Sequence, residues 1–377
     1  MAFNYPDNHA ILGDRTQDRG KGLSDLESNR IDATPQVSIH IEAPATPNRT
    51  AGTMTVTNTA AFPPTALSGT YAGYYSFDIP AGGVYVLYAC GSMGGDITSG
   101  SYASHNAHGF GYQKCYEYTF SGGETIYMMA GQSGGMASDN TGAGGGGMSA
   151  IALSTGADPS SCTALLVGGG GGGDVRSGLH GNSFDIDWQS GNDGEKGHNG
   201  CAGASGLNIG ASNAENTYQS VGNGCTMNNN TYYVNQGANR YHRFAGWHGG
   251  GFNTSGGGSS ARSGGSAGDG FKQGCVGGQA TGTAGFGGFG GGGSSSTNCG
   301  YGGGAGGYTG GMSGGYSNGC GGAGGGGGSY HEATMTVINA YTGRPTSKLP
   351  GCVGIIAKPL YLAGSGTYPN SDLPRGL

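Results

Sequence analysis

The stretch AGGGGMSAIALS at residues 143–154, with TALLVGGGGGG at residues 163–173, decides the fold. In each, a short apolar run with the length and composition of a buried β-strand borders an unbroken run of glycines. Glycine loses more conformational entropy on folding than any other residue, so a glycine run orders only through backbone contacts that side chains would block. We therefore expect a β core joined to packed glycine segments.

The same format of strand followed by glycine recurs along the chain. FDIPAGGVYVLYACGSMGGD at 77–96 and YQKCYEYTFSGGETIYMMAGQSGG at 112–135 each hold two strand-like runs around a turn and end in glycine. Upstream, alternation in two runs on either side of a proline-containing loop predicts a β-hairpin: Val37, Ile39 and Ile41, then Met54 and Val56. Further strands are predicted at 148–154, 163–167, 334–338 and 353–362.

Glycine supplies 89 of the 377 residues, and it is densest between residues 174 and 330. A strict Gly-X-Y period is absent, which excludes collagen, whereas short glycine blocks separated by small or aromatic residues suit bundled polyglycine II helices. The interrupting aromatic side chains would either cap the β core, which we favour, or be displayed. They are Phe286, Phe289, Tyr301, Tyr308, Tyr316 and Tyr330.

The predicted fold class is mainly β: a small, jelly-roll-like β-sandwich with a large glycine-rich insertion of packed polyglycine II helices. Residues 1–66 would form an N-terminal arm and hairpin for assembly, and 67–173 the first part of the sandwich. The insertion would span 174–330, and 331–377 would hold the final strands and a tail. The arm carries one short helix signal, a serine cap facing a glutamate in the sequence Ser24-Asp25-Leu26-Glu27. We expect the arm and hairpin to lean on a neighbouring subunit or on the main domain.

The charge balance excludes some partners. Charged residues make up 10% of the chain and the net charge is −6, so the basic surface that nucleic acids require is missing. The sequence has no apolar run long enough to span a bilayer. The N-terminus lacks a signal peptide's apolar stretch and retains Met1, so we expect release by cell lysis, as for a phage protein, or an atypical export route.

Nine cysteines stand at wide, irregular intervals, and none forms a CxxC pair. This spacing argues against a zinc ribbon and favours disulfides in an oxidising compartment, with one odd thiol left over. The alternative is that they are small buried residues in a reducing cytoplasm. They are Cys90, Cys115, Cys162, Cys201, Cys225, Cys275, Cys299, Cys320 and Cys352.

Motifs that carry catalysis are missing, and we predict that the chain is not an enzyme and needs no cofactor. It has neither a GxxxxGK[ST] phosphate loop nor a GxSxG elbow between a clear strand and helix. His105 and His108 are a weak metal candidate. The acidic stretch at 184–197 offers oxygen ligands that calcium would accept, although a solvated loop is the default interpretation. These ligands are Asp185, Asp187, Asn192, Asp193 and Glu195.

Aromatic residues in the glycine-, asparagine- and serine-rich insertion are candidates for contact with a partner. Such side chains suit stacking on sugars or hot spots of protein interfaces, and the alternative is that they pack beneath the loops. The candidates are Trp188, Tyr232, Tyr233, Tyr241, Trp247 and His248. Sequons at Asn48, Asn229 and Asn253 would permit N-glycosylation if the source exports the chain through a eukaryotic secretory route.

The order of strands and glycine runs resembles a known module, the glycine-rich ectodomain of anaplastic lymphoma kinase and leukocyte tyrosine kinase. It is also similar to glycine-rich modules of bacterial surface proteins and phage fibres. This resemblance implies a β-sandwich with polyglycine helices within about residues 71–362, but not receptor signalling. The segments that carry it are FDIPAGGVYVLYACGSMGGD, ETIYMMAGQSGG, AGGGGMSAIALS, LLVGGGGGG, GFGGFGGGG, GGGAGGYTGG and GGGGGSY.

The function predicted from these features is that of a non-enzymatic structural subunit of an extracellular filament, fibre or virion appendage. Its partners would be copies of itself or other appendage proteins. One alternative is a receptor-binding adhesin at a fibre tip that contacts a host-surface glycan or protein. Another is a soluble ligand-binding ectodomain. In each case the expected location is an extracellular surface or a virion.

Overall fold

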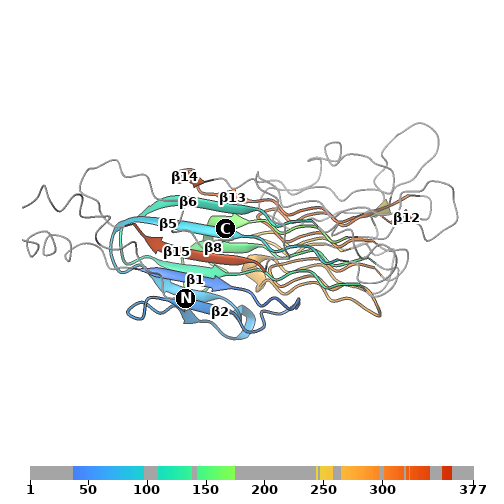
Figure 1. Cartoon of the computed structure of the whole chain (residues 1–377), viewed down its shortest axis with the longest axis horizontal. Helices are drawn as coiled ribbons and strands as arrows, with labels where there is room; N and C mark the ends of the chain where they lie inside the picture. The colour runs from blue at the N-terminus through green and yellow to red at the C-terminus, as the bar shows by residue number, and fades with distance from the viewer. Residues whose placement is uncertain are drawn as a thin grey trace, which may run out of the picture.

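The chain is elongated in the computed structural model, with β-strands toward one end and glycine-rich segments toward the other (Figure 1). The structure describes residues 37–96, 109–137, 142–174, 243–244, 247–257, 265–296, 301–317, 320–321, 323–339 and 350–358. The short helix predicted at residues 24–27 lies outside these ranges.

Two antiparallel sheets of six strands each make up the β part. Sheet A has the order β14-β6-β5-β15-β1-β2. Its strands are β14 (Thr336–Asn339), β6 (Gln113–Phe120), β5 (Gly83–Cys90), β15 (Cys352–Ala357), β1 (Ser38–Glu42) and β2 (Thr55–Asn58). The last strand, β15, therefore lies between β5 and the N-terminal β1, and it joins distant parts of the chain into one sheet.

Sheet B has the order β13-β9-β8-β7-β4-β3. Its strands are β13 (Tyr330–His331), β9 (Cys162–Gly168), β8 (Ser149–Ser154), β7 (Thr125–Met129), β4 (Tyr75–Asp78) and β3 (Thr65–Ala66). The edge strands β13 and β3 have two residues each, which limits the open edges of this sheet. A third, small sheet has the order β10-β11-β12, with β10 (Arg243–Phe244), β11 (Gly315–Ser317) and β12 (Cys320–Gly321).

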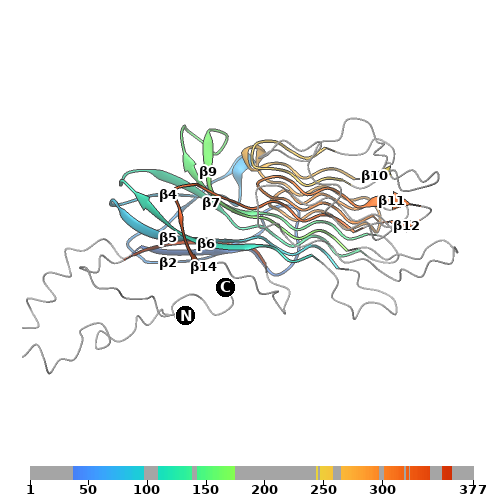
Figure 2. The ribbon, with the colours of Figure 1, turned by 90° about the horizontal axis from the view of Figure 1, so that it is seen from above.

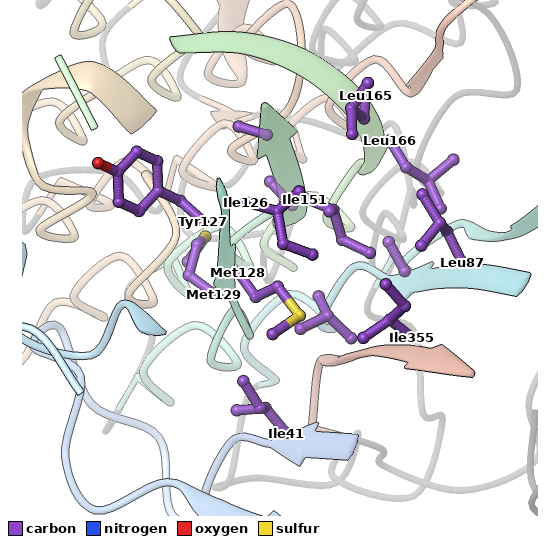
Figure 3. Packing of buried hydrophobic residues seen from close by; sticks show 14 of the residues in the cluster. Ile41, Leu87, Ile126, Tyr127, Met128, Met129, Ile151, Leu165, Leu166 and Ile355 are labelled. Carbon is purple, nitrogen blue, oxygen red and sulfur yellow. The ribbon is translucent and has the colours of Figure 1, made fainter. Parts of the chain in front are cut away.

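The two large sheets pack on one apolar core. Ile41, Leu87 and Ile355 of sheet A face Ile126 and Ile151 of sheet B, and all five side chains are fully buried (Figure 3). Successive strand residues point to opposite faces, so alternate positions of each strand enter this core. The sandwich-like arrangement follows from that shared core.

The outer face of sheet B is covered by a second set of buried residues that belong to the same core cluster. Tyr127 points away from the space between the sheets (Figure 3). Two 3₁₀ turns, η1 (Gly69–Tyr71) and η3 (Phe271–Gln273), contribute Tyr71 and Phe271 on this side. The ring centroids of Tyr74 and Phe271 lie 4.9 Å apart, and those of Phe252 and Phe271 lie 4.8 Å apart.

The predicted mainly-β class is confirmed, and the predicted strands match the observed ones closely. The expected hairpin is present because β1 pairs with β2 in an antiparallel register. It does not stand apart, because β1 also pairs along its length with β15. The hairpin was expected to lean on a neighbouring subunit or on the main domain, and in the structure it pairs with a strand of the main domain. None of the helices among the described residues has the length and apolar character needed to cross a bilayer.

Candidate functional site: a bundle of glycine segments

Extended glycine-rich segments continue from the strands and run side by side (Figures 1 and 2). We call them the glycine bundle. It comprises residues 91–96, 109–112, 130–137, 142–148, 168–174, 247–252, 265–280, 284–296, 301–314 and 323–329. From the sequence, the packed polyglycine helices are expected in the insertion 174–330. The structure shows that the short glycine tails of β5, β7 and β9, and the runs that lead into β6 and β8, belong to the bundle as well.

Segment 168–174 shows how the bundle is held together. Its backbone groups bond to five other segments, and each partner recurs after three residues. Gly170 and Gly173 donate to one neighbour, and Gly171 and Asp174 donate to another. The bonds donated are Gly170–Gly306 (2.9 Å), Gly173–Gly303 (3.0 Å), Gly171–Ser92 (2.9 Å) and Asp174–Gly95 (3.2 Å). Its carbonyls accept from Tyr112, Gly109, Gly327, Gly324, Gly146 and Ala143.

Segment 142–148 repeats this pattern. Gly144 and Gly147 donate to Gly135 and Gln132 of one neighbour, again at a spacing of three residues. Its other amides bond segments 168–174 and 284–296, and its carbonyls also accept from 91–96 and 301–307. A segment that is surrounded by neighbouring backbone segments has no space for a side chain. This explains the unbroken glycine in the two stretches that opened the sequence analysis.

The separation of the backbones requires glycine at these contacts. A Cβ atom built on Gly94 would lie less than 3.0 Å from the carbonyl oxygen of Gly172, and one on Gly91 would meet Gly169 in the same way. A carbon atom and an oxygen atom at such distances overlap, and backbone cannot move aside as a flexible side chain can. Glycine is therefore a packing requirement along the interior segments.

Ser92 joins three segments through its hydroxyl group. Its Oγ donates to the carbonyl of Gln132 (2.6 Å) or Gly147 (2.9 Å) and accepts from the amide of Gly147 (2.8 Å). Gln132, fully buried beside it, donates from Nε2 to the carbonyl of Thr50 in the β1–β2 loop (2.8 Å). These side chains extend the backbone network of the bundle to the sheet end of the molecule.

His248 is buried inside the bundle, with 2% of its surface exposed. Its Nδ1 atom accepts a hydrogen bond from the backbone amide of Ser313 (3.0 Å), so that nitrogen is unprotonated. Burial lowers the pKa of His248 to about 4. A buried, neutral imidazole of this kind serves the bundle's internal bonding. Of the two alternatives stated for His248, display for a partner or packing inside the protein, its burial agrees with the second.

The bundle has two different ends. Near the sheets, its segments run directly into β5, β6, β7, β8, β9 and β13. At the opposite end, which we call the distal end, backbone bonds join Ala137 to Asp96, Asp174 to Gly95 and Ala143 to Asp174. Asp96, Ala137 and Asp174, which belong to three different segments, therefore lie side by side at this end, with Ala143 beside Asp174.

Most of the described aromatic interruptions lie against the β core. Phe289 is fully buried within the main core cluster, and Tyr308 and Tyr330 pack against that cluster, in agreement with the favoured capping role, whereas Tyr301 is fully buried outside it. Phe286, Tyr308 and Tyr330 are half-buried, and the rings of Tyr308 and Tyr330 stack with their centroids 4.2 Å apart. For Tyr316 only the backbone is described. Trp247 is half-buried and occupies the space beside Gly265.

Several predicted site residues lie outside the described ranges. They are Trp188, Tyr232, Tyr233 and Tyr241, the acidic residues Asp185, Asp187, Asn192, Asp193 and Glu195, the histidines His105 and His108, and the sequon Asn229. Within the described ranges, Asn48 and Asn253 are both half-buried. No cluster of three potential metal ligands among histidine, cysteine, aspartate and glutamate occurs in this described part.

The disulfide prediction is wrong for five cysteines. Cys90, Cys115, Cys162, Cys275 and Cys352 are free thiols in this structure. Burial raises the pKa of Cys115 to about 11 and of Cys162 and Cys275 to about 12. These residues act mainly as small apolar side chains, the alternative stated above. Cys201, Cys225 and Cys299 lie outside the described ranges, and for Cys320 only the backbone is described.

No protein-family model matches the chain, and no curated protein matches it in sequence.

Proposed function

We propose that this chain is a non-enzymatic receptor-binding module at the tip of an extracellular fibre or virion appendage. The observation that carries the proposal is that the two ends of the glycine bundle differ. Its sheet end is anchored in the apolar core, while Asp96, Ala137 and Asp174, from three different segments, lie together at the distal end. A rigid support that gathers several segments at one end is the usual way in which proteins present a binding surface.

We further propose that the bundle consists of polyglycine II helices. This helix has three residues per turn and no internal hydrogen bonds, so each amide points to a neighbouring chain and every third amide points to the same neighbour. The three-residue repeat of partners along 142–148 and 168–174 supports this proposal. So does the resemblance to glycine-rich fibre and receptor modules. The interior offers mostly backbone, with a few hydroxyl groups and the hydrogen-bonded side chains of Gln132 and His248, which suits a rigid support better than catalysis.

Replacement of the longest distal connection tests the proposal. In the variant, residues 176–241 are replaced by a short Gly-Ser linker. This connection carries the predicted aromatic candidates Trp188, Tyr232, Tyr233 and Tyr241. The labelled full chain and the variant are compared on a glycan microarray and on a panel of intact bacterial and animal cells. We expect the variant to keep the unfolding midpoint of the full chain and to lose its attachment.

Equal attachment by the variant and the full chain would overturn the role of this connection. Micrographs of the same preparation provide a second readout. A tip module gives discrete particles, whereas regular filaments formed by the purified chain would favour a structural subunit.

The structural subunit remains the second candidate, and one observation favours it. β14 is an edge strand of sheet A, and its Val337 is 53% exposed. An apolar edge strand can pair with a strand of another chain. If the chain forms filaments, Val337→Lys should abolish them, and deletion of residues 1–33 would show whether the N-terminal arm takes part. Filaments that persist in both variants would remove this candidate's support.

A further inference from the structure

Three of the free thiols lie on the outer face of sheet A, the face turned away from the core. Cys115 and Cys352 form a small buried cluster there with Val86 and Tyr88, separate from the main core, and the partly buried Cys90 packs against it. Alternation along β5 explains this placement, because Leu87 and Ala89 point inward and the residues between them point outward. The outer face of sheet A therefore carries a group of cysteine side chains, whereas its inner face carries mainly aliphatic side chains.

The strand register singles out one pair within this cluster. Cys352 of β15 lies directly opposite Cys90 of β5 in the antiparallel ladder. Directly opposed residues in such a ladder have Cα atoms about 4.5–5.5 Å apart, within the range of about 4.4–6.8 Å that disulfides span. Cys115 lies opposite Tyr88 instead, so it is only a diagonal neighbour of Cys90.

We propose that Cys90 and Cys352 are a reversible redox modification site, at which the two free thiols close to a cross-strand disulfide when the protein meets a small-molecule disulfide. The site fastens β15, the central strand that joins the N-terminal hairpin to the rest of sheet A, to β5. This inference is independent of the proposed receptor-binding role.

The reaction consumes one small disulfide and balances as follows. The Cys90 thiol loses its proton, and its sulfur attacks one sulfur of the oxidant, breaking that S–S bond and releasing one small thiol. The Cys352 sulfur, after losing its proton, attacks Cys90 in the mixed disulfide and releases the second small thiol. The two protein thiols are oxidised by two electrons, and the oxidant takes both electrons and both protons.

Exposure and hydrogen bonding favour this order of attack. Cys90 is half-exposed, whereas Cys352 is 8% exposed, so a reagent reaches Cys90 first. The hydrogen bond with Cys352, followed by burial, raises the pKa of Cys90 well above its usual range. Only a thiolate attacks a disulfide, so the pair should stay reduced in neutral buffer and close faster as the pH rises.

Peptide mapping of the full-length protein tests the assignment. The reduced protein is incubated with oxidised glutathione at pH 8, its remaining thiols are alkylated under denaturing conditions, and it is digested with trypsin without reduction. Cleavage after Lys114 separates Cys90 from Cys115, and cleavage after Lys348 releases the peptide that holds Cys352. We expect the dominant linked pair to join Cys90 to Cys352.

Matched variants supply the control. Oxidation should raise the unfolding midpoint of the wild type and of Cys115→Ser, and it should leave that of Cys90→Ser and Cys352→Ser unchanged. A dominant link from Cys90 to Cys115 would overturn the proposal. So would a Cys90 that remains alkylated, or capped by glutathione, after the oxidant has acted. The mapping on wild-type protein decides the question even if a serine variant fails to fold.

Discussion

Gly94 packs against Gly172 so closely that a Cβ atom on Gly94 would lie less than 3.0 Å from the carbonyl oxygen of Gly172. The two glycines belong to segments that run in parallel, because Gly171 bonds to Ser92 and Asp174 bonds to Gly95. Contacts of this kind recur every three residues. In the glycine bundle they take the place of the side-chain packing found in an ordinary core.

Gly94→Ala should destabilise the fold by about 3 kcal/mol, because the added methyl group meets rigid backbone and the segments must separate. The measurement is the free energy of unfolding from chemical denaturation. Gly123→Ala is the control. Its φ of +84° is strained for alanine, but nothing lies within 4 Å of its Cβ position, so it should cost roughly 1–2 kcal/mol. Equal losses in the two variants would contradict the packing argument.

Ser92→Ala should cost about 2 kcal/mol, because it removes the hydroxyl that bonds Gln132 and Gly147 inside a fully buried site. Ser161→Ala, at an exposed position, should change stability by less than about 0.5 kcal/mol. Urea denaturation of the two variants beside the wild type provides the comparison. A neutral effect at Ser92 would mean that the three segments hold together without it.

His248 should make the protein less stable as the pH falls. Its pKa in the fold is about 4, against 6.5 for a solvent-exposed histidine, so the unfolded chain takes up the proton first. The stability contributed by the neutral imidazole is fully present above pH 6.5 and is lost between about pH 6.5 and 4, a loss of about 3 kcal/mol. Below about pH 4 both states are protonated and the loss is complete.

His248→Asn isolates this contribution, since asparagine does not titrate and its oxygen can accept the bond from the Ser313 amide. The free energy of unfolding at pH 7 and pH 4.5 is compared for the two proteins. We expect a smaller fall in the variant. An identical fall would assign the acid sensitivity to other groups.

Ile151→Ala should destabilise the sandwich by about 3 kcal/mol, because the side chain is fully buried between the sheets and its removal leaves a cavity. Val337→Ala, at a 53% exposed position on β14, should stay within about 0.5 kcal/mol of the wild type. Thermal unfolding followed by circular dichroism measures both. A much smaller loss of stability in Ile151→Ala would contradict the position of this side chain in the core between the sheets.

Much of the β part could be predicted from local pattern. The alternation of Ile39 and Ile41 with polar residues, and the apolar runs before the glycines, mark strands because side chains alternate across a sheet. The position of β15 between β5 and β1 could not be predicted, because strand partners far apart in the chain leave no local signal. The pairing of Cys352 with Cys90, separated by 352 − 90 = 262 residues, depends on that placement.

The sequence by itself determined that strands of this chain would end in glycine, and that any order in those runs would come from backbone contacts rather than from side chains. The physical reason is that the absence of a Cβ atom and a period of two in apolar residues are local properties, readable one segment at a time. Only the tertiary structure decided which segments surround one another. It brought the tails of β5, β7 and β9 into the bundle, buried His248 within it, and placed Asp96, Ala137 and Asp174 together at its distal end.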